Sequence, residues 1–96
     1  MATFISLVSL TDQGIRSIKE SPKRAEAFKA MAKKLGVTVK EVYWTVGHYD
    51  VVVILEGEDE AVTATLLKVG SLGNVRSETL RAFSGAEMSR IVGNIP

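Results

Sequence analysis

The sequence predicts an α+β fold whose elements follow the order strand, helix, strand, strand, helix, strand, with a short helix appended. Two observations lead to this prediction. Residues 3–10 and 51–55 are apolar on both alternation phases, as in central strands that are covered on both faces. Two other segments carry apolar residues at helical spacing and end near glycine. This split βαβ order gives a four-stranded antiparallel sheet with both main helices on one face.

The first half of the chain supplies the first strand, over residues 3–10, and the first main helix. Thr11 with Asp12 offers an N-cap for a short helix that reaches Glu20. Ser21 then caps a new helix, and the proline after it is tolerated at the first helical position. A continuous apolar stripe marks this main helix and consists of Ala25, Phe28, Met31, Ala32 and Leu35.

The second half supplies the other three strands. They are expected over residues 37–46, from residue 50 or 51 to 56, and over 74–83, with a tight connection between the first two. The second main helix opens at residues 57–60, where acidic side chains gather near its positive end. The expected contacts of a tail helix at about residues 85–92 are Met88, Ile91 and Val92.

The composition excludes several classes of protein. A length of 96 residues fits a single domain over residues 1–96. Twelve basic and eleven acidic residues leave a net charge of +1, too weak a field to attract nucleic acid. The chain has no cysteine and one histidine, His48, so we expect no disulfide, no metal site and no cofactor. Residues 4–10 are too short to span a membrane and resemble no signal peptide, so we expect a cytoplasmic protein without a membrane contact.

The predicted sheet has one face that no helix covers. Aliphatic side chains of both central strands point to that face, because these strands are apolar on both alternation phases. A monomer rarely leaves an apolar patch of more than a few hundred Å2 open. We therefore expect a second copy of the chain to pack sheet against sheet, in a homodimer or a larger homo-oligomer.

Gly47, Tyr49 and Asp50 form a Gly-x-Tyr-Asp motif within residues 43–50, and this segment resembles the GYD domain family, which is named for the motif. Further blocks that resemble the family are residues 13–16, 21–24, 70–76 and 78–83, so the likeness runs from about residue 2 to about residue 90. The resemblance implies a ferredoxin-like fold akin to the dimeric α/β-barrel proteins. It implies no established activity.

Residues 47–50 have two interpretations. In a hairpin, Gly47 supplies a positive backbone dihedral and Asp50 hydrogen-bonds local amides. At the edge of a pocket, Asp50 acts as an acid or base or orients a polar ligand group. Tyr49 and Trp44 then form flat apolar walls, with a hydroxyl and an indole donor. The hairpin is the more frequent outcome, because turns select the same residue types.

His48 and Arg76 complete the candidate ligand-binding residues. Histidine is the usual proton carrier in enzymes, but His48 occupies the variable position of the motif, and a solvent-exposed turn histidine is the more common case. Arg76 and Glu78 point to the same side of the last strand, where they form an ion pair across the sheet or a dimer interface, or where the arginine anchors a carboxylate or phosphate. Tyr43 and Trp44 adjoin on a strand, so one packs under the helices and the other reaches the open face.

These features favour a small homo-oligomeric binding or interaction module, with an assembly-dependent small-molecule pocket near residues 47–50. The alternative is a cofactor-independent enzyme, similar to a monooxygenase or isomerase, that acts on a small aromatic or carbonyl compound. That alternative rests on analogy with dimeric α/β-barrel relatives. A ligand-sensing role is a third hypothesis, although no DNA-binding helix pair accompanies the domain. A buried Asp50 beside Tyr49 and Trp44 favours the enzyme, whereas an Asp50 that only caps the turn disfavours it.

Overall fold

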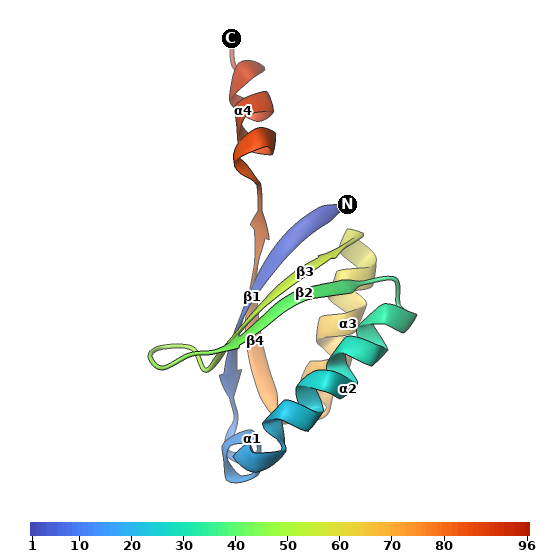
Figure 1. Cartoon of the computed structure of the whole chain (residues 1–96), viewed down its shortest axis with the longest axis vertical. Helices are drawn as coiled ribbons and strands as arrows, with labels where there is room; N and C mark the ends of the chain where they lie inside the picture. The colour runs from blue at the N-terminus through green and yellow to red at the C-terminus, as the bar shows by residue number, and fades with distance from the viewer.

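The computed structural model describes all 96 residues, and it has the predicted element order (Figure 1). In chain order the elements are β1 (Ala2–Leu10), α1 (Asp12–Arg16), the 3-10 turn η1 (Ile18–Glu20), α2 (Ser21–Lys34), β2 (Thr38–Trp44), β3 (Val51–Gly57), α3 (Asp59–Ser71), β4 (Val75–Ala82) and α4 (Gly85–Gly93). The short helix expected up to Glu20 is therefore divided into α1 and η1.

The four strands form one antiparallel sheet in the order β2-β3-β1-β4. The prediction that the first and third strands are central is confirmed. The helices cover one of the two apolar faces of these strands, and the other face is uncovered in the single chain. The α+β class and the four-stranded antiparallel sheet are thus as the sequence predicts.

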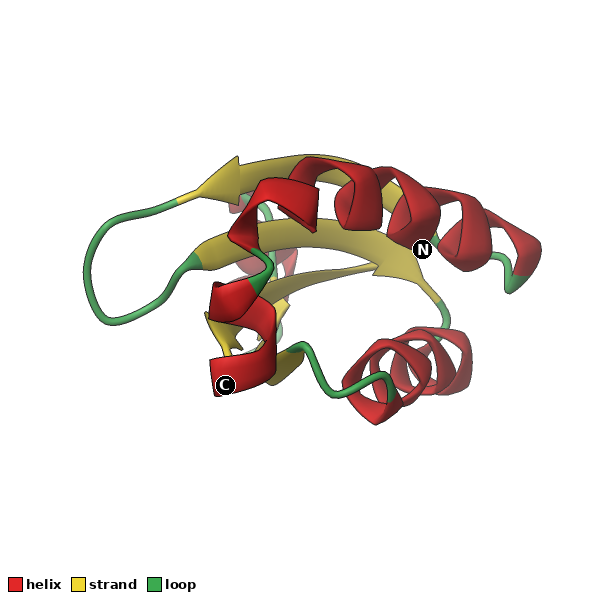
Figure 2. Cartoon of the chain, turned by 90° about the horizontal axis from the view of Figure 1, so that it is seen from below, coloured by secondary structure: helices red, strands yellow, loops and turns green.

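The helices α2 and α3 lie on the same side of the sheet (Figure 2). The core lies between them and the sheet. It is tightest where the C-terminal half of α2 meets the N-terminal half of α3, because Ala32, Val37, Leu55 and Val62 are all almost completely buried there. Each of these side chains has therefore lost nearly all its contact with water, which makes this end the most stable part of the helix layer.

The expectation that Ser21 caps α2 is wrong. The chain enters α2 directly from η1, and Glu20 already has helical dihedrals, so Ser21 lies inside the helix and makes no cap hydrogen bond. Its hydroxyl instead accepts a hydrogen bond of 3.0 Å from Nε1 of Trp44 on β2. By contrast Thr11 does cap α1, since its Oγ1 accepts from the amide of Gly14 at 3.1 Å.

The start of α1 is fastened to the turn between α3 and β4. Nε2 of Gln13 donates to the carbonyl of Leu72 at 3.0 Å and to Oδ1 of Asn74 at 2.9 Å. The hydroxyl of Thr11 donates to the carbonyl of Gly73 at 2.6 Å. Gly14 is buried directly against the carbonyl of Asn74, where a Cβ atom would lie 2.1 Å from the carbonyl oxygen. Two segments about sixty residues apart thus form one tightly packed corner.

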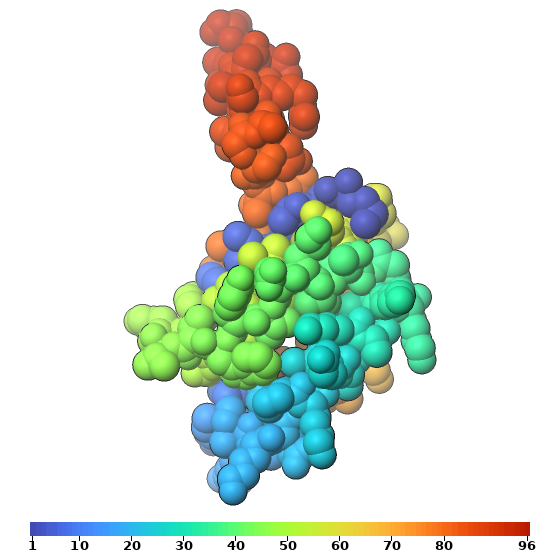
Figure 3. Space-filling view, viewed as in Figure 1, coloured from blue at the N-terminus to red at the C-terminus, as the bar shows by residue number.

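The last helix, α4, projects away from the rest of the molecule (Figures 1 and 3). The expectation that Met88, Ile91 and Val92 contact the body of the same chain is wrong, because α4 buries no residue and Met88 remains 44% exposed. The projecting helix also explains why the Cα radius of gyration is 14.6 Å, against about 12.5 Å for a compact chain of this length.

A capping box holds the first turn of α4 without help from tertiary contacts. The hydroxyl of Ser84 accepts from the amide of Glu87, and the carboxylate of Glu87 accepts from the amide of Ser84. The hydrogen bond from the Ser84 amide, followed by the one involving the Ser84 side chain, lowers the pKa of Glu87. At neutral pH the carboxylate is therefore fully charged and α4 has a preformed N-terminus.

Candidate functional site

The face of the sheet opposite α2 and α3 is covered by no element of the chain. The strand register places on it an apolar set formed by Ile5, Leu7, Tyr43, Val52, Ile54 and Leu80. Tyr43 is 53% exposed and Leu80 is 45% exposed. The charged side chains of Glu41, Arg76 and Glu78 lie on the edge strands of the same face. We call these nine residues the open face.

The connection between β2 and β3 is the hairpin that residues 47–50 predict. Gly47 has a φ of +148°, a value that side-chain-bearing residues rarely adopt, so glycine is required there. The loop is closed by hydrogen bonds from the amide of Thr45 to the carbonyl of Asp50 at 2.8 Å and from the Thr45 hydroxyl to the carbonyl of Tyr49 at 2.5 Å. The hairpin projects beyond the edge of the sheet (Figure 1).

Asp50 fastens this hairpin to the end of β1. Its Oδ2 accepts a hydrogen bond from the amide of Leu10 at 2.8 Å, and its own amide donates to the carbonyl of Val8 at 2.8 Å. The side chain is half-buried and is directed at backbone groups. This geometry corresponds to the structural interpretation of the motif aspartate, with the partner amide forty residues away instead of within the turn.

We therefore predict that Asp50→Ala lowers the stability of the folded chain. The substitution leaves the part-buried amide of Leu10 without its charged acceptor, which costs about 1.5–3 kcal/mol. Asp50→Asn keeps an acceptor oxygen at the same place and should cost less. Urea unfolding followed by circular dichroism measures both values. An Asp50→Ala variant as stable as the parent would contradict the structural assignment of this carboxylate.

Tyr49 leaves the hairpin toward the open face. Its hydroxyl donates a hydrogen bond of 2.9 Å to Oε2 of Glu78 on β4, so the hairpin is fixed across the sheet at a second point. This hydrogen bond, and then the negative charge of Glu78, raise the pKa of Tyr49, because loss of the phenol proton would place two negative charges together. The phenol therefore keeps its proton at physiological pH. It can donate a hydrogen bond there, but it does not act as a base.

His48 and Arg76 have no partner that would mark a catalytic arrangement. The ring of His48 is exposed, with its centroid 6.4 Å from that of Tyr49. Arg76 is paired in the sheet with Ser9 and shares its face with Glu78, as predicted. No ion pair joins Arg76 to Glu78 within the chain, whose salt bridges are Lys29–Glu26 and Lys40–Glu56. Arg76 is thus a free cation on the open face.

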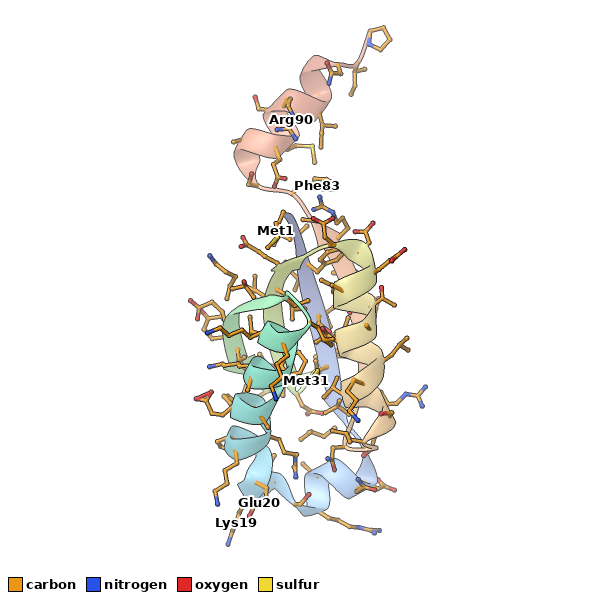
Figure 4. The ribbon with its side chains drawn as sticks, turned by 90° about the vertical axis from the view of Figure 1, so that its right-hand side faces the viewer. Met1, Lys19, Glu20, Met31, Phe83 and Arg90 are labelled. Atoms are coloured by element: carbon orange, nitrogen blue, oxygen red, sulfur yellow. The ribbon has the colours of Figure 1, made fainter.

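Tyr43 and Trp44 face opposite sides of the sheet as predicted, with Trp44 under the helices and Tyr43 on the open face. Trp44 is one wall of an apolar hollow of about 270 Å3 between α2, α3 and the sheet. Met31 of α2, which is labelled in Figure 4, is another. We call this space the helix-layer hollow. Fourteen of its twenty lining residues are hydrophobic, and none is acidic.

The five candidate residues therefore do not converge on one point. Arg76 belongs to the open face and Tyr49 contacts it, whereas His48 lies on the exposed hairpin, Asp50 anchors that hairpin and Trp44 lines the helix-layer hollow. Sequence reasoning missed the hollow itself. The available signal was the small Ala25 in the apolar stripe of α2, which leaves space where a larger side chain would fill the core.

No group of three or more His, Cys, Asp or Glu side chains is arranged to hold a metal ion. Among the helices, none has both the length and the apolar character required to span a bilayer.

The family model of the GYD domain matches residues 4–92 of the chain. The chain belongs to the GYD domain family. The match includes the hairpin motif and the corner formed by α1 and the α3–β4 turn. The predicted resemblance is thus confirmed over nearly the whole chain.

One relative of this GYD domain is a Thermus thermophilus protein named "Glutamine synthetase and cystathionine beta-lyase binding protein". It is 37% identical over 90 residues, which cover 92% of this chain and 95% of that protein. Among solved structures, TTHA0845 from Thermus thermophilus aligns with a TM-score of 0.56 at 27% identity, over 88% of this chain and 96% of the other. FFRP-DM1 aligns with a TM-score of 0.62, over 86% and 100% respectively, and at 21% identity it shows a shared fold.

Proposed function

We propose that this GYD domain is a protein-interaction module that assembles with itself through the open face and presents α4 to a metabolic enzyme. The observation that supports it most is the uncovered apolar surface of the two central strands, flanked by charged side chains on the edge strands. The name of the Thermus thermophilus relative supports the same general activity, because it describes a protein that binds other proteins.

The exposed area supports self-assembly. The chain exposes 6503 Å2, whereas a compact monomer of its 10.4 kDa exposes about 5,400 Å2. Both the projecting α4 and the uncovered open face contribute to this difference, so part of it is available to a second copy. Only 12 of 96 residues are buried, so the single chain leaves much of its apolar surface to a second copy.

The charges of β4 fit a second copy better than they fit an unrelated partner. A two-fold axis brings residue i of one chain to residue j of the other and the reverse. Arg76 and Glu78 are two residues apart on the open face and are not paired with each other. Across a two-fold axis each can meet the opposite charge of the partner, so the contact is complementary to itself.

In this assembly, three of the candidate ligand-binding residues lie near the interface between the two copies. Tyr49 and Arg76 point polar groups toward the open face, and the ring of His48 lies near that of Tyr49. We place the proposed small-molecule pocket near residues 47–50 between the two copies, where it is complete only after assembly.

The helix α4 supplies a second surface, which self-assembly through the sheet leaves free. Met88, Ile91 and Val92 of α4 follow helical spacing and are exposed, and Ile95 just beyond the helix is exposed as well. A preformed amphipathic helix of this kind binds an apolar groove on a partner. We assign this groove to glutamine synthetase or cystathionine β-lyase, the two enzymes in the name of the relative.

The test measures the mass of the protein in solution and its binding to the two enzymes. Light scattering at micromolar concentration should give at least twice the 10.4 kDa of the chain. Purified glutamine synthetase or cystathionine β-lyase of the same organism should bind the immobilised protein. Ile91→Glu, which places a charge on the apolar stripe, should weaken binding about tenfold or more without changing the mass.

The matched control is Ala86→Glu, which adds the same charge on the opposite side of α4 and should bind normally. A stable monomer contradicts self-assembly. Failure to bind either enzyme contradicts the assigned partners, and equal losses in the two variants contradict the role of the apolar stripe.

A further inference from the structure

The helix-layer hollow has a structural cause that distinguishes it from loose packing. The two long helices close over the sheet at one end, where Ala32, Leu55 and Val62 are buried. At the other end the hollow lies between the N-terminal half of α2 and the C-terminal half of α3, which both supply lining residues. The small side chains of Ser6 and Ala25 line this end and leave the space unfilled.

The size of the hollow matches a small organic molecule. An apolar cavity of about 150 Å3 holds one benzene molecule, so about 270 Å3 corresponds to roughly ten non-hydrogen atoms. The walls are mainly aliphatic and aromatic, with Phe28, Met31 and Val69 among them. Such a wall favours an apolar body in the ligand.

Two positively charged side chains at the hollow indicate that one end of the ligand carries a negative charge. Arg24 is half-buried and Lys68 is exposed, so both cations lie where the hollow meets solvent. Neither forms a salt bridge, and no acidic residue lines the hollow. The guanidinium of Arg24 is held in place by hydrogen bonds to Oγ of Ser17 at 3.1 Å, to the carbonyl of Ser17 at 2.9 Å and to that of Gly14 at 3.3 Å.

The guanidinium of Arg24 has N–H groups left that can donate hydrogen bonds to a ligand. It has five N–H groups, of which three are used by these hydrogen bonds. An orientated cation with free donors beside an apolar space is suited to a carboxylate that carries an apolar group. A neutral ligand would leave both cations without a counter-charge.

We propose that the helix-layer hollow binds a small apolar monocarboxylate, with its alkyl or aryl body between α2 and α3 and its carboxylate at Arg24 and Lys68. The site is separate from the open face and from α4, so it does not depend on the assembly or partner proposed above.

The methionines provide a direct measurement. The three methionines, each with its methyl group labelled with carbon-13, lie at the N-terminus (Met1), in the hollow (Met31) and on α4 (Met88). Titration with octanoate, and separately with 3-phenylpropanoate, should shift the Met31 methyl resonance and leave the other two in place. Octan-1-ol should bind about tenfold or more weakly than octanoate, because it lacks the charge. The two acids distinguish an alkyl from an aryl ligand.

Three variants test the site. Ala25→Leu fills the hollow and should abolish the shift of Met31, whereas Ala30→Leu, on the exposed side of the same helix, should bind octanoate like the parent. Lys68→Gln should weaken octanoate about tenfold and octan-1-ol hardly at all. Since Lys68 makes no internal salt bridge, this variant tests the carboxylate contact without disturbing the fold.

Several results would overturn the proposal. They are an unchanged Met31 resonance at millimolar octanoate, equal affinity for octan-1-ol and octanoate, or undiminished binding by Ala25→Leu. A nuclear Overhauser contact between the Met31 and Met88 methyl groups in the ligand-free protein would also overturn it. That contact would show that α4 of a second copy occupies the hollow.

Discussion

Leu7→Glu is expected to convert the proposed homo-oligomer into a single chain at micromolar concentration. Leu7 lies in the middle of the open face, paired with Val52 of β3 and Glu78 of β4. In the proposed homo-oligomer the new carboxylate would be buried against apolar side chains and close to Glu78. A charge buried without a partner costs several kcal/mol, so the dissociation constant should rise about 100-fold or more. Light scattering over a concentration series measures this change.

The matched control is Leu67→Glu. Leu67 is 69% exposed on α3, on the side of the sheet opposite the open face, so the same substitution there should leave the mass unchanged. Far-UV circular dichroism of both variants establishes that the fold is intact. If Leu7→Glu fails to fold, the smaller Val52→Thr should still weaken the assembly. A Leu7→Glu protein that keeps the parent's mass rules out self-assembly through the open face.

Gly14→Ala is expected to destabilise the fold strongly although it adds one methyl group. The Cβ atom would lie 2.1 Å from the carbonyl oxygen of Asn74, and neither backbone segment can move freely. Gln13 and Thr11 bind the same turn through hydrogen bonds to Leu72, Gly73 and Asn74. Overpacking of this kind costs about 2–3 kcal/mol, which lowers the Tm of a domain of this size by about 10–20 °C.

Gly70→Ala makes the same chemical change in a helix and should have the opposite sign. Nothing lies within 4 Å of a Cβ atom at position 70, and its backbone is helical. Alanine is about 0.5–1 kcal/mol better than glycine in a helix, so the Tm should rise by a few degrees. Calorimetry at one fixed protein concentration compares the two variants. Equal effects of the two substitutions would mean that the corner between α1 and the α3–β4 turn is loosely packed.

The sequence was a good guide to the elements that depend on local pattern. The two-phase apolar character of residues 3–10 and 51–55 correctly identified the central strands, because only a central strand needs apolar groups on both faces. Glycine and alternation likewise located the hairpin at residues 47–50. Ser21 failed as a predicted cap because the preceding turn is itself helical, and no residue type near Ser21 signals that geometry.

The candidate site was less predictable, because its residues are brought together by distant parts of the chain. The partner of Asp50 is the amide of Leu10, and the partner of Tyr49 is Glu78, so neither contact can be read from the residues around the motif. The motif did single out the hairpin anchor correctly. The predicted pairing of Trp44 with Tyr49 in one pocket is not observed. Side chains alternate between the two faces along a strand, and this alternation places Trp44 under the helices.

The sequence by itself determined the family, the order of elements and the existence of an apolar face that no helix covers. The family follows from the motif and its flanking blocks. The order of elements and the apolar face follow from periodicity and composition, which are local properties of the chain. Only the tertiary structure decided that α4 leaves the body and that the helix-layer hollow lies between α2 and α3. The physical reason is that packing between helices depends on how side chains from distant segments fill a shared space, and a residue pattern does not encode the space that remains unfilled.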